Sequence, residues 1–183
     1  LTTPVLEDTA FFLHDINPDR LETARLIGED LVRGFGGKAK VNVSLDRKEA
    51  LRDADFVVNM IQVGMHEATL KDFQIPAKYG LKQTIADTTG VGGSFRGLRT
   101  LPVLLAMAKE MAEVCPNAWL LNYTNPMPIN CLGLALGTKK LGIEIKFVGL
   151  CHSVQSTGKL LANYVNVPYE ELEYLVAGIN HMS

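Results

Sequence analysis

The sequence predicts an α/β fold in which a parallel β-sheet carries helices on both faces. Short apolar runs alternate with segments of helical periodicity along the whole chain, which is the pattern of strand–helix–strand units. Residues 55–61 give the strongest strand signal, an apolar run of the kind that a strand covered on both sides needs. No repeat or low-complexity tract interrupts the pattern, and the crossovers are expected to be right-handed.

In the first half of the chain, an apolar strand at residues 11–15 ends in an acid. Residues 18–33 follow with apolar side chains at helical spacing. A short strand at residues 41–43 and a short helix at residues 48–52 precede the strong strand at residues 55–61.

In the second half, residues 95–114 predict a long amphipathic helix with Pro102 near its start, where a missing N–H is best tolerated. Apolar runs predict three further strands, at residues 118–122, 147–150 and 172–177. Helical spacing predicts the helices beside them at residues 126–136 and 157–164.

Composition excludes several classes of protein. The 183 residues are 47% hydrophobic and 21% charged, which is typical of a soluble globular protein. A net charge of -2 gives no electrostatic reason to expect nucleic acid or an anionic membrane as a partner. The apolar runs are too short to span a bilayer, and no secretion signal opens the chain. Three sparse cysteines favour a reducing cytoplasm over a disulfide scaffold.

Ligands of open parallel sheets bind beyond the carboxyl ends of the strands. Asp15 ends the first strand, where a dinucleotide-binding fold places an acid that accepts hydrogen bonds from the adenosine ribose. From Asp15 alone, a capping or turn acid is an equally good interpretation. No glycine fingerprint precedes Asp15, and Gly34, Gly36 and Gly37 follow a helix, which predicts a C-cap and turn. We therefore expect a Rossmann-like sheet that lacks its first strand and glycine loop.

Polar residues also follow the later strands. Asn125, before Pro126, places an amide at a strand–helix junction, although a plain capping role is the simpler interpretation. Cys151 and His181 each end a predicted strand, so they could share one metal ion at the same edge of the sheet, with positions left open for substrate. Their spacing matches no zinc-finger pattern. Asp87 lies in a glycine-rich loop that could line a sugar site or serve only as a connection.

Several segments together resemble glycoside hydrolase family four, in the right order along nearly the whole chain. The segments are DIN (15–17), ADFVV (54–58), QTIADT (83–88), RGLR (96–99), LNYTNPM (121–127), VGLCHSVQ (148–155) and AGINHM (177–182). The Cys-His-Ser-Val form at residues 151–154 is similar to the α-galactosidase branch of that family.

The resemblance implies NAD and a divalent metal, usually Mn2+, as cofactors. It implies Cys151 and His181 as metal ligands, and Asn125 and Asp87 as substrate-binding residues. His152 is a candidate for leaving-group protonation or sugar selection, that is, a catalytic and substrate-binding residue. The implied cofactor-binding residues are Asp15, Asn59, Ile61, Gln62 and Asn122.

The implied reaction hydrolyses an α-galactoside by redox and elimination steps, in a family that does not use the usual pair of carboxylates. NAD takes a hydride from C3 of the sugar, which acidifies the C2 proton, while the metal stabilises the enolate. A base removes that proton, the aglycone leaves, water adds and the hydride returns. The family's base follows Ser183, so we assign none, and we expect residues 1–183 alone to be inactive.

The expected organisation is a partial NAD-binding domain at residues 1–170 and the start of a substrate domain at residues 171–183. The resemblance implies a homo-oligomer, a dimer or tetramer, in the full-length protein. The residues leave other functions open. These are an α-glucosidase or α-uronidase of the same family, a malate- or lactate-type dehydrogenase, and a non-catalytic dinucleotide-binding module.

Overall fold

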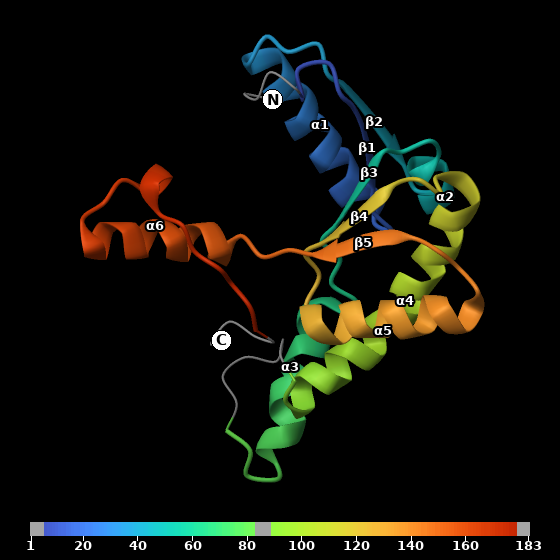
Figure 1. The fold of residues 1–183 in the computed structure, drawn as a ribbon. Helices are drawn as coiled ribbons and strands as arrows, with labels where there is room; N and C mark the ends of the chain where they lie inside the picture. Colours follow the sequence, from blue (N-terminus) through green and yellow to red (C-terminus); the bar gives the residue numbers. More distant parts are fainter. Residues whose placement is uncertain (1–5, 83–88, 179–183) are drawn as a thin grey trace. The chain divides into compact units, whose positions relative to one another are not determined.

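The computed structural model describes residues 6–82 and 89–178. By the packing of the chain they belong to two compact units, which we describe separately (Figure 1). Unit 1 consists of Leu1–Asp55 and Lys109–Ala118, and unit 2 of Phe56–Ala108 and Trp119–Ser183.

Strands and helices alternate along the described chain, as predicted, except that two helices separate the third strand from the fourth. The strands are β1 (Ala10–His14), β2 (Lys40–Ser44), β3 (Phe56–Asn59), β4 (Trp119–Asn122) and β5 (Lys146–Gly149). The helices are α1 (Pro18–Gly34), α2 (Arg47–Leu51), α3 (Met65–Ala77), α4 (Val91–Val114), α5 (Met127–Leu141), α6 (Ser153–Val165) and the 3-10 turn η2 (Tyr169–Glu171). Among the described residues, no helix is long and apolar enough to cross a membrane.

Unit 1 holds the parallel pair β1–β2, in which Phe11 lies opposite Val41. Helix α1 begins where the sequence predicts, because the Asn17 side chain accepts a hydrogen bond from the Arg20 N–H and Pro18 takes the first helical position. The helix ends at Gly34, and Gly36 follows with a φ of 64°, a conformation that favours glycine. This confirms the predicted C-cap and turn.

An ion pair joins α2 to the end of α4 that belongs to unit 1. Arg47 Nε and Nη2 donate to the two carboxylate oxygens of Glu110, at 2.6 and 2.8 Å. The guanidinium of Arg47 holds the pKa of Glu110 below its ordinary value. Because that pKa is lowered in the folded state, the pair stabilises the fold above the unfolded-state pKa of Glu110, and this stabilisation is lost as pH falls through the lowered value.

We therefore expect Arg47→Ala to raise the pKa of Glu110 toward its ordinary value and to make acid unfolding begin at a higher pH. Carboxyl NMR titration of Glu110, with circular dichroism across the acid range, measures both. Lys48→Ala is a suitable control, since Lys48 pairs mainly with the exposed Glu113. A Glu110 pKa that did not rise in Arg47→Ala would contradict this account.

Unit 2 holds the three-stranded parallel sheet β3-β4-β5. In the register of the sheet Phe56 lies opposite Trp119, and Asn59 lies opposite Asn122. The two residues of a pair share a face, and the two pairs lie on opposite faces. One face is covered, with Leu120 fully buried. On the other face Phe56 and Val58 are exposed, so the burial on both sides that residues 55–61 predicted is not found there.

Helices α4 and α5 pack closely against each other in unit 2. A Cβ added to Gly133 of α5 would lie 2.6 Å from the Leu101 side chain of α4, so a larger residue would force the helices apart. Leu104 and Leu134, one from each helix, are fully buried. Pro102 lies near the middle of α4 and not near its start, because the helix begins at Val91, earlier than predicted.

The parallel strands form two sheets, of two and three strands, where the pattern predicted one. A doubly wound sheet of order 3-2-1-4-5-6 without its first strand consists of a pair, 3-2, and a triple, 4-5-6. The observed order, β1-β2 and β3-β4-β5, has this division. Within the described residues, the strand topology thus agrees with the predicted Rossmann-like fold.

Two further differences concern whether an element exists at all. Helix α3 was not predicted; Gly64 precedes it in a left-handed conformation and gives no side-chain cap, so the usual start signal is missing. The strand predicted at residues 172–177 is wrong, since residues 172–178 are in no strand. Instead the Tyr174 ring approaches Gly158 of α6, and its hydroxyl lies 2.9 Å from that of Tyr169.

Candidate functional site

The three strands of unit 2 end together. Asn59, Asn122 and Gly149 are the last residues of β3, β4 and β5 and stand opposite one another in register. Backbone hydrogen bonds continue past the strands, from Tyr123 N–H to the Asn59 carbonyl at 2.8 Å and from Leu150 N–H to the Asn122 carbonyl at 2.9 Å. Asn59 and Asn122 at this carboxyl edge, together with the loops that begin there, account for most of the predicted site residues.

A buried amide network lies beneath the edge. Asn59 Nδ2 donates to Asn122 Oδ1 at 2.8 Å, and Asn122 Nδ2 donates to the Thr124 carbonyl at 3.1 Å. Asn130 Nδ2, from α5, donates to the same carbonyl at 2.9 Å. The Thr124 hydroxyl donates to the Ile61 carbonyl at 3.2 Å. The network therefore ties the loop after β3 to the loop after β4.

The side chains of Asn59 and Asn122 are at most 2% exposed. Within the described part of the chain, the Oδ1 atoms of Asn59 and Asn130 are buried without a hydrogen-bond partner. The side chains of Asn59 and Asn122 therefore point into the protein. At these two positions a cofactor could be contacted only by backbone atoms. Sequence reasoning missed Thr124 and Asn130 as members of the network; a polar Asn130 in an apolar helical run was the available signal.

Arg99 of α4 binds the loop after β3 through a backbone carbonyl. Arg99 Nε donates to the Val63 carbonyl at 2.9 Å, while its two Nη atoms donate to the carboxylate of Asp72, in α3, at 3.1 and 2.7 Å. Asp72 is 1% exposed. Gly64 adopts a φ of 80°, and a Cβ there would meet both Ala68 and Arg99. Gln62, exposed in the same loop, donates to the Thr69 hydroxyl.

Asn125, Cys151 and His152 lie in the loops after β4 and β5. Asn125 is half-buried and precedes Pro126, which caps α5 and is not its first residue as predicted. Cys151 is half-buried, and His152 is exposed at the position before α6. An amide, a thiol and an imidazole thus follow two neighbouring strands at one edge, a set that can bind hydroxyl groups and a borderline cation.

Two predicted site residues, Asp87 and His181, lie outside the described residues, so the predicted pairing of Cys151 with His181 stays a prediction. Within residues 6–82 and 89–178, no group of three or more His, Cys, Asp or Glu side chains is placed to hold a metal ion.

Asp15 follows β1 in unit 1. Its Oδ1 accepts from the Asn17 N–H at 2.8 Å and from Arg20 Nη2 at 2.6 Å, and its Oδ2 accepts from Arg20 Nε at 3.0 Å. The Arg20 guanidinium holds the pKa of Asp15 below its ordinary value. The side chain is therefore an ionised carboxylate with a turn role already in place, at a strand end where a ribose could also be bound.

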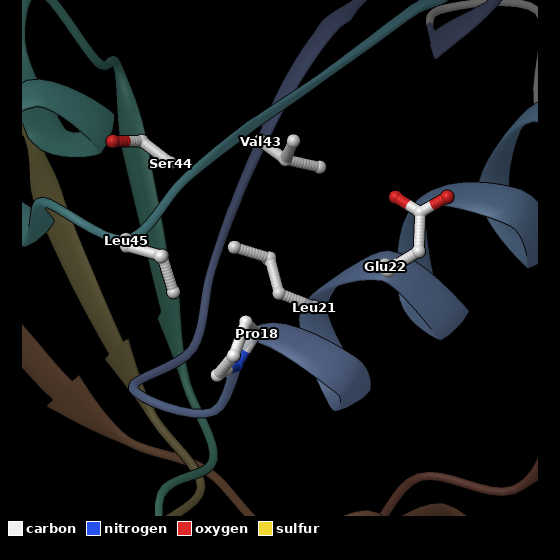
Figure 2. Close-up of a pocket in the computed structure, with 6 residues that line it drawn as sticks. All are labelled: Pro18, Leu21, Glu22, Val43, Ser44 and Leu45. Atoms are coloured by element: carbon white, nitrogen blue, oxygen red, sulfur yellow. The ribbon is translucent and has the colours of Figure 1, made fainter.

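A shallow, mostly apolar hollow opens between α1 and the end of β2 in unit 1 (Figure 2). Figure 2 shows Leu21 on the helix side of it and Val43 on the strand side. Its lining residues are Pro18, Leu21, Glu22, Val43, Ser44 and Leu45, none of which is a predicted site residue.

The sequence profile described as Family 4 glycosyl hydrolase matches residues 1–167. The chain belongs to glycosyl hydrolase family 4. Membership confirms the resemblance inferred from the seven sequence segments and does not favour the dehydrogenase alternative. Asn125, Cys151 and His152, in the loops after β4 and β5, all lie within the matched residues.

Among family 4 relatives, the α-galactosidase of Bacillus subtilis (strain 168) is 46% identical over 100% of this chain and 41% of its own length. The α-glucosidase of Erwinia rhapontici is 35% identical over 97% of this chain and 39% of its own length. The chain therefore spans about two fifths of the length of these relatives.

A solved structure of the 6-phospho-β-glucosidase of Thermotoga maritima, with manganese, NAD+ and glucose-6-phosphate, matches with a TM-score of 0.74. It is 25% identical, and the match covers 90% of this chain and 38% of that one. This likeness confirms the predicted Rossmann-like fold.

Proposed function

We propose that the full-length protein hydrolyses α-galactosides with the help of NAD and a divalent cation. The observation that carries the proposal is the 46% identity to an α-galactosidase over the whole chain. The geometry supports it, because the half-buried Asn125 and Cys151 and the exposed His152 follow neighbouring strands at one edge of unit 2. In this proposal the enzyme is a cytoplasmic homo-oligomer.

The chemistry of the proposed donors suits both cofactors. When bound, NAD supplies reversible hydride transfer at C3 of the sugar, and the cation, Mn2+ in the first instance, supplies a Lewis acid at the C2 and C3 oxygens. Cys151 and His181 would hold the cation, a thiolate and a neutral imidazole that leave positions open for sugar oxygens. Asp15 would hold the ribose, and the backbone of Asn59, Ile61, Gln62 and Asn122 would border the dinucleotide.

The remaining residues orient the sugar. The Asn125 amide would bind a sugar hydroxyl, with Asp87 in the same pocket. The buried network beneath Asn125 fixes the backbone of its loop through Thr124, so the amide is presented from a rigid support. His152 would protonate the leaving oxygen or select the sugar, since its exposed imidazole can reach a ligand and carries both a donor and an acceptor nitrogen. No residue of the chain is assigned as the base that takes the C2 proton.

The test is turnover of nitrophenyl α-galactoside by the full-length protein, with Mn2+ and NAD each supplied or withheld. We expect turnover only when both are present, and none from residues 1–183 alone. Nitrophenyl α-glucoside and α-galacturonide should be poorer substrates. Faster turnover of either would move the protein to another branch of family 4. Binding of NAD with no turnover of any glycoside would favour the non-catalytic module.

A further inference from the structure

Asp15 and Arg20 form a tight pair at the start of α1, within unit 1. Arg20 donates to both oxygens of the Asp15 carboxylate, at 2.6 and 3.0 Å. The side chain of Arg20 is 45% exposed and that of Asp15 is 32% exposed, so a ligand from solvent can reach either of them. The Asn17 side chain caps the Arg20 N–H, which fixes the backbone from which Arg20 projects.

The hydrogen bonds of Asp15 leave it little free capacity. An ionised carboxylate has about four acceptor positions. Arg20 takes two and the Asn17 N–H takes a third. A ribose that donates from two neighbouring hydroxyl groups needs two acceptors. Binding of the ribose to Asp15 must therefore displace at least one of these three contacts, two of which are made by Arg20.

Arg20 has no competing acidic partner on its helix among the described residues. Glu22 is close along the helix, but Arg25 occupies both of its oxygens, at 2.8 and 2.6 Å. If Asp15 did not hold it, Arg20 would be an unpaired guanidinium next to the N-terminus of a 17-residue helix. A guanidinium binds phosphate through paired N–H donors, and the helix dipole favours an anion at the same place.

We infer that Arg20 is a latent phosphate-binding residue, and that Asp15 selects NAD over NADP partly by keeping Arg20 occupied. The inference rests on the proposed function, because it assumes that Asp15 is the ribose-binding acid. In dinucleotide-binding folds an acid at this position accepts from the ribose 2′-hydroxyl, whereas a nearby arginine accommodates the 2′-phosphate of NADP. Here both residue types are present, and the acid holds the arginine.

The test compares NAD+ and NADP+ binding by calorimetry in full-length wild-type protein and Asp15→Ser. We expect the wild type to prefer NAD+. In Asp15→Ser, NAD+ binding should weaken by about tenfold or more, and NADP+ binding should strengthen by a similar factor. The double variant Asp15→Ser/Arg20→Gln should lose the gain in NADP+ affinity.

Glu22→Ser is the matched control, since it removes a carboxylate paired with an arginine on the same helix and makes the same change in net charge. It should alter neither affinity; a gain for NADP+ there would show a general charge effect and overturn the inference. The inference is also wrong if Asp15→Ser, shown to be folded by its melting temperature, gains no NADP+ affinity, or if the double variant keeps the gain. A wild type that bound neither dinucleotide would instead refute the proposed function.

Discussion

Cys151→Ser in the full-length protein is expected to abolish manganese-dependent turnover of nitrophenyl α-galactoside, with a loss in kcat/KM of at least about 100-fold. A thiolate is an anionic ligand, whereas a serine hydroxyl stays neutral near pH 7 and binds a cation weakly. Cys151 lies one residue beyond Leu150, whose N–H is fixed to the Asn122 carbonyl at 2.9 Å, so the loop has little freedom to bring in another ligand.

The measurement is kcat/KM across a Mn2+ titration, together with Mn2+ binding followed by electron paramagnetic resonance. Cys131→Ser makes the same chemical change in α5 and is the matched control. Burial raises the pKa of the Cys131 thiol, which suits a packing role and not a metal ligand. The Cys131 variant should keep its dependence on Mn2+. Wild-type activity and Mn2+ affinity in Cys151→Ser would remove Cys151 from the proposed metal site.

The sequence predicts helices well where local signals mark their ends. The predicted bounds of helix α1 agree with the structure to within one residue, because Asn17 and Pro18 at its start and the glycines after it each have a local physical effect. Helix α3 has no such signals: Gly64 precedes it in a left-handed conformation and Pro76 lies inside its last turn. Helix α3 is joined to α4 by the contact of Asp72 with Arg99, 27 residues away, and a long-range contact of this kind leaves no periodic trace in the sequence.

The candidate site was predictable in position but not in orientation. The end of β4 at Asn122 is as predicted, whereas β3 ends at Asn59, two residues before the predicted end at residue 61. Their side chains bond each other in the interior, however, because on a strand the direction of a side chain alternates with each residue. A shift of one residue in the pairing register of a strand would exchange its buried and accessible faces. The roles of such residues therefore depend on register, which single-sequence reasoning does not fix.

Arg99 binds both the loop that follows β3 and the buried Asp72, and Arg99→Ala is the second change with a large expected effect. It would remove the Arg99 guanidinium from the carboxylate of Asp72, which is 1% exposed, and the Arg99 donor from the Val63 carbonyl. Breaking a buried pair from one side costs about 3 kcal/mol or more, since the remaining charge stays desolvated. Because 25% of the Arg99 side chain meets solvent, which screens the pair in part, we expect a cost near the lower end of that range.

We expect the melting temperature of full-length Arg99→Ala to fall by several degrees, and amide exchange in α3 and in the loop before it to accelerate. Arg33→Ala removes an exposed arginine paired at 3.7 Å and should change the melting temperature little. The double variant Arg99→Met/Asp72→Leu separates charge from packing. It removes the buried carboxylate together with its partner, so it should recover much of the lost stability. If it melted as low as Arg99→Ala, the contact with the Val63 carbonyl, and not the ion pair, would be what holds α3 and its loop against α4.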